Sequence, residues 1–203
     1  AEARIADLAF FDQLTGLPNR TLLLDRLRQA TTASGRGGKY GALLLIDLDQ
    51  FKTLNDTLGH DVGDCLLKQA ARRLLQCVRD GDTVARLGGD EFVVLLTSLS
   101  PSEVDAGSNT KAVARKILHA LGRDYQLGAV VHHSTASIGA TLFLGQAASV
   151  DDLMKQVDLA LYRTKAAGRN NVRFFDPEME TAVLREVALE KDLDEAIAAR
   201  QFL

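Results

Sequence analysis

Apolar positions recur along the chain with two different spacings, and this pattern predicts alternating helices and strands. A helical spacing predicts helices over residues 21–29, 64–78, 104–121 and 149–168. Short apolar or alternating runs predict strands over residues 41–48, 83–87, 92–96, 126–133, 137–144 and 171–175. This order of elements favours an α/β (α+β) fold in which helices pack on one mixed or antiparallel sheet.

Turn and cap signals mark several boundaries between these elements. Residues 34–38 are rich in glycine and predict a loop. The sequence Gly88-Gly89-Asp90-Glu91 separates two short strand patterns and predicts the turn of a β-hairpin. Ser149 is a candidate N-cap residue for the helix that follows it.

Both ends of the chain are expected to be helical extensions of one compact domain over residues 12–175. Residues 1–11 predict a short lead-in helix. Residues 176–203 predict a long amphipathic linker helix with Asp176 as its N-cap and Pro177 as its first residue. This last segment carries eight acids and three bases, a net charge of −5, whereas the whole chain has −3.

Composition and charge exclude several classes of protein. The 203 residues contain 46% apolar and 25% charged residues, which excludes a disordered or fibrous chain. Apolar runs such as residues 42–46 are far shorter than a membrane span, and no secretory signal is visible. A net charge of −3 gives no basic surplus for a nucleic-acid partner. Cys65 and Cys77, twelve residues apart on one predicted helix, are expected to be free thiols, which favours a cytoplasmic protein.

Two pairs of acids are candidates for chemistry. Asp47 and Asp49 end an apolar strand and share one face of it, where carboxylates could bind Mg²⁺ or could simply end the strand with polar residues. Gly88 and Gly89 allow the main chain to approach a phosphate closely, although paired glycines also occur in ordinary hairpin turns. The adjacent acids that follow them would repel each other unless a cation is bound.

The motifs together resemble a known family. Arg86-Leu87-Gly88-Gly89-Asp90-Glu91-Phe92 is the signature of the GGDEF family of diguanylate cyclases. The other family motifs present are Asp12-Gln13-Leu14-Thr15-Gly16-Leu17-Pro18-Asn19-Arg20, Asp47-Leu48-Asp49-Gln50-Phe51-Lys52, Asn55-Asp56, Gly59-His60, Gly63-Asp64, Ser137-Ile138-Gly139, Tyr162 to Lys165, and Gly168-Arg169-Asn170. These motifs stand in family order and at family spacing, which makes chance similarity negligible over residues 12–175.

The resemblance implies a fold, a reaction and a metal site. The expected fold is the palm-like nucleotidyl-cyclase fold, with a mostly antiparallel central sheet, packed helices and a hairpin that carries the signature. The expected reaction joins two GTP molecules into cyclic di-GMP and releases pyrophosphate. By resemblance, Asp47, the Leu48 carbonyl, Asp90 and Glu91 hold Mg²⁺ or Mn²⁺. Asp90 and Glu91 are the expected catalytic residues, and Asp90 would help to deprotonate the attacking 3′-hydroxyl.

The resemblance also implies a set of substrate-binding residues. These are Lys52, Asn55, His60, Asp64, Gly88, Gly89, Lys165 and Arg169. Lys52, Lys165 and Arg169 would hold the phosphates. Asn55 and Asp64 would bind the base, because guanine offers two parallel N–H donors to a carboxylate whereas adenine does not, so ATP should be rejected. Asp64 as the N-cap of the following helix is compatible with this role.

Regulation and partners follow from the same resemblance. Arg79 and Asp82 match the RxxD pattern of the family's product-inhibition site, with a surface-loop salt bridge as the alternative. Catalysis would require a second GGDEF domain in a transient homodimer. Residues 14–27 and 185–203 resemble GGDEF domains that precede an EAL phosphodiesterase domain, so a GTP-binding regulatory module without turnover is the alternative function. The expected location is the cytoplasm, either alone or as the cytoplasmic part of a membrane-bound sensor.

Overall fold

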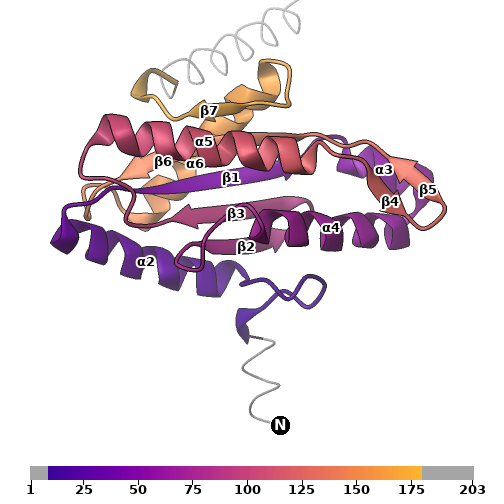
Figure 1. The fold of residues 1–203 in the computed structure, drawn as a ribbon, viewed down its shortest axis with the longest axis horizontal. Coiled ribbons are helices and arrows are strands. Elements are labelled where there is room, and N and C mark those ends of the chain that lie inside the picture. The colour runs from indigo at the N-terminus through magenta and orange to yellow at the C-terminus, as the bar shows by residue number, and fades with distance from the viewer. Residues whose placement is uncertain (1–8, 180–203) are drawn as a thin grey trace, which may run out of the picture.

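The elements of the fold are seen in a computed structural model, which describes residues 9–179 (Figure 1). Their bounds are α2 (Arg20–Gly37), β1 (Gly41–Leu48), α3 (Phe51–Leu58), α4 (His60–Leu75), β2 (Thr83–Gly88), β3 (Glu91–Leu96), α5 (Glu103–Leu121), β4 (Tyr125–Leu127), β5 (Val130–His132), β6 (Ala136–Phe143), α6 (Val150–Ala166) and β7 (Val172–Phe174). The alternation of helices and strands agrees with the predicted α/β class.

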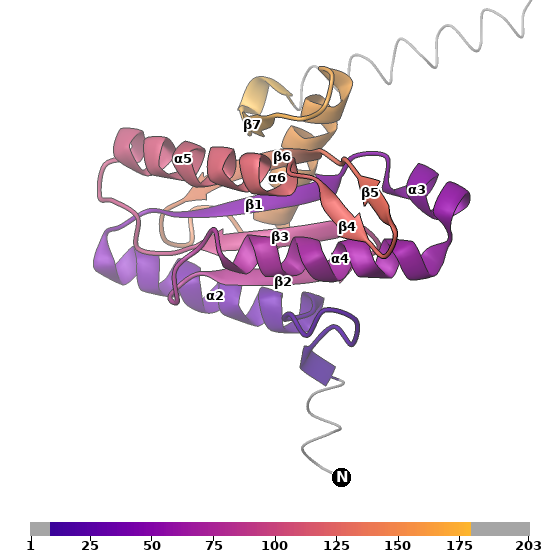
Figure 2. The same ribbon diagram turned by 45° about the vertical axis from the view of Figure 1, so that its right-hand side comes forward.

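A five-stranded sheet forms the centre of the fold. Its strand order is β2-β3-β1-β6-β7, with antiparallel pairing throughout except for the parallel pair β6–β7. Helices α4 and α5 cover one face of the sheet, and α2 and α6 cover the other (Figures 1 and 2). The short hairpin β4–β5 lies outside the sheet, near α3 and α4. The predicted mostly antiparallel sheet with packed helices is confirmed.

The central strand β1 is buried on both faces, which explains why its sequence is apolar without alternation. Leu44 and Ile46 pack into the core cluster that includes α4 and α5 residues. Leu43 and Leu45 pack into the second cluster, which includes α2 and α6 residues. Side chains along a strand alternate between the two faces of the sheet. Asp47 therefore points to the same side as Leu43 and Leu45, the side that α2 and α6 cover.

Helix α6 lies unusually close to the sheet at Gly139 of β6. A Cβ atom at this position would collide with the main chain of α6 at Val157 and Leu161. Ser149 caps the helix through a capping box with Asp152, as its sequence position predicts. The absent side chain at Gly139 thus sets how near the C-terminal end of α6 comes to the strands.

The predicted loop at residues 34–38 is wrong, because α2 continues to Gly37 and is capped by Gly38, which has φ 61°. Gly35 serves close packing rather than a turn, since a Cβ there would approach the Gly145 main chain at 3.1 Å. The Ser34 hydroxyl donates to the Lys39 carbonyl at 2.6 Å and secures this helix end.

The predicted helix over residues 64–78 has different bounds. It begins at His60 and ends at Leu75, and a separate helix, α3, precedes it. Gly59, with φ 90°, separates the two helices, so Asp64 lies inside α4 and is not its N-cap. Cys77 consequently lies beyond the helix that contains Cys65, and both thiols are free as predicted.

The predicted strand over residues 126–133 is two strands, β4 and β5, joined at Gly128, whose φ of 65° allows the chain to reverse. The lead-in helix and the C-terminal helix fall largely outside the described residues. Within them, residues 9–10 and 177–179 are helical, and the Asp176 carboxylate accepts from the Glu178 amide at 2.9 Å. No helix in the described part is long and apolar enough to cross a membrane.

Candidate active site

The end of β1 places acidic residues from two strands side by side. Asp47 is directly opposite Glu91 in the antiparallel register of β1 and β3. Val93 and Leu95, which alternate with Glu91 along β3, belong to the same core cluster as Leu43 and Leu45 of β1. Asp47 and Glu91 therefore share one face at one end of the sheet.

Burial and mutual repulsion make this pair costly to ionise. Burial raises the pKa of Asp47, the hydrogen bond from Lys165 lowers it, and the charge of Asp90 raises it, with a net increase. Burial also raises the pKa of Glu91, and the charges of Asp47 and Asp90 add to the increase. The Lys165 ammonium lies 2.8 Å from the Asp47 carboxylate and partly compensates this charge. The electrostatics thus favour a cation at this end of the sheet.

The donor set fits a hard divalent cation that shares its ligands with a substrate. Among the described residues, no three His, Cys, Asp or Glu side chains are arranged to hold a metal ion by themselves. Mg²⁺ commonly binds one or two carboxylates together with substrate phosphates and needs no complete protein cage. Asp47 and Glu91, with Asp90 next along the chain, provide such a partial set.

The hairpin tip is held by an arginine that sequence analysis did not assign a role. Gly88 and Gly89 have φ of 146° and 50°, values that favour glycine, and the β2–β3 register shifts between Arg86 and Gly88. Arg86 donates to the Gly89 carbonyl from Nε at 3.1 Å and from Nη2 at 2.7 Å. The conformation of the tip therefore depends on this guanidinium.

Arg86 also joins the tip to the segment before α2. Its Nη1 lies 2.8 Å from Asp12 Oδ1. Burial alone would raise the pKa of Asp12, but hydrogen bonds from Thr15 and the Arg86 charge outweigh it, so the pKa is lowered. The two residues are 74 positions apart, and no local signal pairs them.

Four of the predicted substrate-binding residues lie on two neighbouring helices. Lys52 and Asn55 are on α3, whereas His60 and Asp64 are on α4. A Cβ at Gly63 would collide with the Asn55 side chain, so the helices meet beside Asp64. Asn55 Oδ1 is buried and has no hydrogen-bond partner among the described residues. An unsatisfied buried acceptor fits a site that is completed by a ligand donor.

The predicted phosphate-binding residues Lys165 and Arg169 lie at the C-terminal end of α6 and in the loop that follows it. Arg169 is exposed and has φ 63°, and its amide donates to the Thr164 carbonyl at 3.1 Å. Lys165 already contacts Asp47. The fold therefore brings Lys165 to the acidic end of β1 although the two residues are far apart in sequence.

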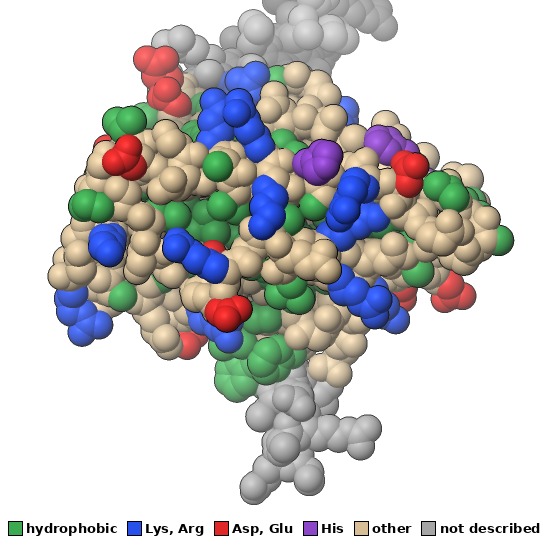
Figure 3. All heavy atoms as spheres, in the orientation of Figure 1, with side chains coloured by type: hydrophobic (Ala, Val, Ile, Leu, Met, Phe, Trp, Pro, Cys, Tyr) green, Lys and Arg blue, Asp and Glu red, His purple; other side chains and the backbone are tan. Residues whose placement is uncertain are grey.

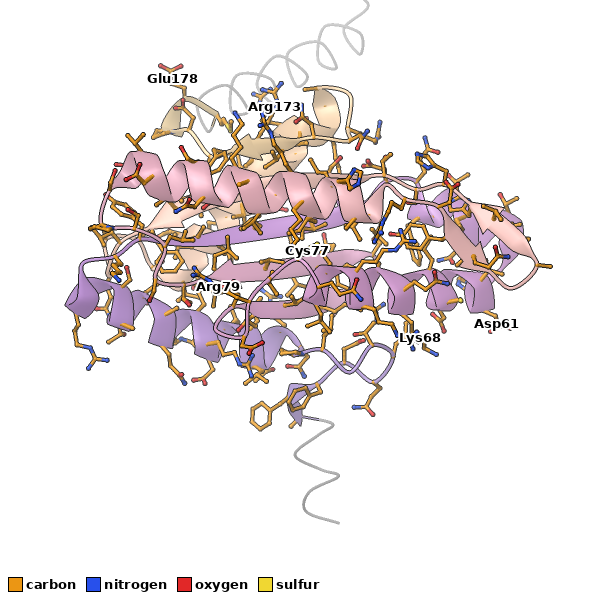
Figure 4. The ribbon with its side chains drawn as sticks, viewed as in Figure 1. Asp61, Lys68, Cys77, Arg79, Arg173 and Glu178 are labelled. Atoms are coloured by element: carbon orange, nitrogen blue, oxygen red, sulfur yellow. The ribbon has the colours of Figure 1, made fainter. Side chains whose placement is uncertain are left out.

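Arg79 and Asp82 lie elsewhere, between α4 and β2. Arg79 Nε is 3.5 Å from Asp82 Oδ2, and the two side chains are 61% and 3% exposed. The Asp82 carboxylate also accepts from the amides of Arg79 and Thr97, at 3.2 Å each. A cavity of about 480 Å³ beside both residues extends to Lys116 of α5. Figure 4 shows Arg79 past one end of α4 and Asp61 at the other.

Known proteins with similar sequence are longer than this chain. The bifunctional diguanylate cyclase/cyclic di-GMP phosphodiesterase MucR of Pseudomonas aeruginosa is 38% identical over 203 residues. The match covers all of this chain but only 29% of MucR. The chain thus spans less than a third of the length of this relative.

Solved structures share the fold. The GGDEF domain of YfiN, also called TpbB, from Pseudomonas aeruginosa superposes with a TM-score of 0.80 at 32% identity, covering 86% of this chain and 99% of that one. The coiled coil and GGDEF domain of DgcB from Caulobacter crescentus, in complex with cyclic di-GMP, gives a TM-score of 0.76 at 27% identity, covering 85% and 89%.

The match to a family covers the central part of the chain. The family described as "Diguanylate cyclase, GGDEF domain" matches residues 9–171. This range contains the acidic end of β1, the glycine hairpin and the Lys165 helix end that form the site above. Together with the shared fold, the match shows that the chain belongs to the GGDEF family.

Proposed function

We propose that the chain is a diguanylate cyclase domain that condenses two GTP molecules into cyclic di-GMP. The observation that supports this most is the position of Asp47 opposite Glu91, with Lys165 of α6 against the same carboxylate. An acidic strand end with a neighbouring lysine suits a nucleoside triphosphate and its divalent cation. The family membership supports the same reaction class.

Asp47, Asp90 and the Leu48 carbonyl would hold Mg²⁺ or Mn²⁺, with Glu91 available for a second ion. When bound, the cation would neutralise phosphate charge and lower the pKa of the attacking hydroxyl. The raised pKa values of Asp47 and Glu91 support this assignment, because burial and, after it, the charges of neighbouring acids make both carboxylates costly to ionise, and a bound divalent cation would offset that cost.

The remaining residues would bind and orient GTP. Asn55 and Asp64 would accept the N–H donors of guanine, and the unsatisfied Asn55 Oδ1 supports this role. His60, Gly88 and Gly89 would line the nucleotide site, and Lys52, Lys165 and Arg169 would bind the phosphates. Asp90 would accept the proton of the 3′-hydroxyl.

The reaction needs two GTP-loaded domains. In each half-reaction a 3′-oxygen forms a bond to the α-phosphorus of the other nucleotide, the bond to the β-phosphate breaks, and pyrophosphate leaves. Two such steps close the ring and release two pyrophosphates. One domain offers one set of base-binding residues, so a second GGDEF domain, in a transient homodimer, would supply the other nucleotide.

Incubation of the purified chain with GTP and Mg²⁺ or Mn²⁺ tests this function directly. We expect cyclic di-GMP and pyrophosphate from GTP, no cyclic product from ATP, and no turnover in excess chelator. Chromatography of the products identifies them. Absence of cyclic di-GMP at high protein concentration, where two domains can meet, would contradict the proposal.

A GTP-binding regulatory module is the second candidate. The relative MucR is bifunctional, and this chain spans only 29% of it, so a GGDEF domain can accompany a phosphodiesterase activity. In that case the domain would control an attached EAL domain by binding GTP. Calorimetry together with chromatography of the products distinguishes the two functions, because the module would bind GTP with the cation but form no cyclic di-GMP.

A further inference from the structure

Asp49, the second acid of the Asp47-Leu48-Asp49 sequence, has an environment unlike that of Asp47. The residue is 7% exposed, and its carboxylate accepts three hydrogen bonds. The donors are the Thr135 hydroxyl at 2.6 Å, the Ser137 hydroxyl at 2.7 Å and the Asn170 amide at 3.2 Å. These bonds satisfy the buried carboxylate with donors from the protein, and one of the donors comes from the loop that carries Arg169.

The Asn170 amide belongs to a loop with a strained backbone. Three consecutive residues, Gly168, Arg169 and Asn170, have positive φ of 109°, 63° and 46°. A non-glycine residue in this region is strained, and the conformation persists only when its surroundings impose it. Such strain is often found where a side chain must be presented in one orientation.

The hydrogen bonds of this loop show what imposes the conformation. The amides of Gly168 and Arg169 bond back to the last turn of α6, at Lys165 and Thr164. The Asn170 amide instead bonds to Asp49, 121 residues away, at the end of β1. The loop is therefore tied to the strand that carries Asp47, immediately after the strained Arg169.

We propose that Asp49 is a positioning residue: its carboxylate holds the 168–170 loop in the left-handed conformation that presents Arg169 to the phosphates of the nucleotide. This inference rests on the proposed binding of GTP by this chain. Asp49 acts through a hydrogen-bond acceptor, whereas a metal ligand acts through charge. The two roles respond differently to conservative substitution, which makes them separable.

Replacement of Asp49 by Ala and by Asn separates these roles. Asp49→Ala leaves the Asn170 amide without its acceptor, and we expect at least tenfold weaker GTP binding in the presence of Mg²⁺, measured by calorimetry. Asp49→Asn keeps an acceptor oxygen for Asn170 and offers its NH₂ to the Ser137 hydroxyl, so binding within about threefold of wild type is expected. Equal losses in both variants would indicate a metal ligand and overturn the inference.

Two further variants locate the effect. In the Arg169→Ala background, Asp49→Ala should weaken GTP binding by less than about twofold, because the residue through which it acts is gone. Ser137→Ala is the matched control, since it removes a bond to the same carboxylate without touching the loop, and it should leave GTP affinity unchanged. A tenfold effect that persists without Arg169 would contradict the positioning role.

Amide hydrogen exchange supplies a readout that does not depend on GTP. Asp49→Ala should accelerate exchange at Asn170 relative to wild type, whereas Asp49→Asn should retain most of the protection. If Asp49→Ala does not fold, Asp49→Ser replaces it, because the shorter hydroxyl cannot reach Asn170. If wild type binds no GTP, the proposed function fails, while unchanged exchange at Asn170 in the Ala or Ser variant would overturn the loop assignment alone.

Discussion

The ionised carboxylate of Asp47 destabilises the folded protein. Its pKa is raised by burial and by Asp90, so the folded state holds the proton more tightly than the unfolded chain does. The ionised carboxylate therefore lowers stability as pH rises above the unfolded value of about 3.8, fully so above the folded pKa. Asp47→Asn should raise Tm at pH 7 without divalent cations, and the difference from wild type should shrink below the raised pKa.

The same substitution should abolish activity. Turnover of GTP should fall by more than about tenfold in Asp47→Asn, and likewise in Asp90→Ala, because each substitution would remove a proposed ligand of the divalent cation. Mg²⁺ or Mn²⁺ should raise the Tm of wild type but not that of Asp47→Asn. A variant that is both less stable and fully active would contradict the assignment of Asp47 to the metal site.

Asp64 tests the selection of the base. Asp64→Asn replaces one acceptor oxygen by a donor that faces the N–H groups of guanine, so GTP affinity should fall by about tenfold or more. Competition of GTP against ATP in a calorimetric titration measures the change. Asp61→Asn, at an exposed position one turn earlier on α4, is the control and should behave as wild type (Figure 4). Unchanged preference for GTP in Asp64→Asn would assign the base to other residues.

At the scale of elements, the contact of α6 with β6 controls where Lys165 lies. Gly139→Ala would force the α6 main chain away from the sheet, and we expect a loss of about 1–3 kcal/mol in the free energy of unfolding. Denaturant unfolding measures the loss. GTP affinity should fall too, because Lys165 follows Leu161 by about one turn.

A second glycine offers a matched control for this substitution. Gly107 lies within α5, where a Cβ would meet Leu142 Cδ1 at an ordinary 3.7 Å. Gly107→Ala should therefore stabilise the protein by about 0.5–1 kcal/mol through helix propensity. If both alanine variants changed stability in the same direction, the close approach at Gly139 would not be the cause.

At the scale of the whole molecule, the reaction should depend on encounters between domains. If each chain binds one GTP, as proposed, the rate of cyclic di-GMP formation should rise faster than linearly with protein concentration while the chain is monomeric. A series of initial rates over protein concentration, with the oligomeric state measured by light scattering, checks this. Strict proportionality in the monomeric range would refute the two-chain reaction.

Arg79 should act on the reaction from a distance. The 16 residues of α4 span about 24 Å between the helix start near α3 and the end that leads to Arg79. The 480 Å³ cavity beside Arg79 is also lined by Lys116 of α5, and Figure 3 shows further Lys and Arg side chains scattered over the face that α4 and α5 cover. A phosphate-bearing product bound here would leave the nucleotide residues free, so its effect would come from how two domains are held.

The expected consequence is loss of product inhibition. Arg79→Ala should weaken cyclic di-GMP binding by at least tenfold, about 1.4 kcal/mol, without lowering the initial rate. Calorimetric titration with cyclic di-GMP measures the affinity, and Lys68→Ala, an exposed basic residue of α4, serves as the control (Figure 4). Equal affinities of wild type and Arg79→Ala would leave Arg79 as a surface residue that pairs with Asp82.

Local patterns in the sequence determined much of this molecule. The apolar run of β1, the glycine hairpin with its two acids, and the Ser149 cap follow from spacing and turn chemistry over a few residues. The GGDEF motifs predicted the family and the mostly antiparallel sheet, both confirmed. The predicted loop at residues 34–38 was wrong because Gly35 packs against a distant segment, which local spacing cannot register.

Tertiary structure alone decided how the site is assembled. Strand alternation predicted that Asp47 and Asp49 share a face, yet only the fold gives them different partners, Lys165 for one and Asn170 for the other. The bond between Arg86 and Asp12 joins residues 74 positions apart. The physical reason is the separation of these residues in sequence. Periodicity and capping depend on neighbours within a few residues, whereas these contacts form only when helices and loops from distant parts of the chain pack onto the sheet.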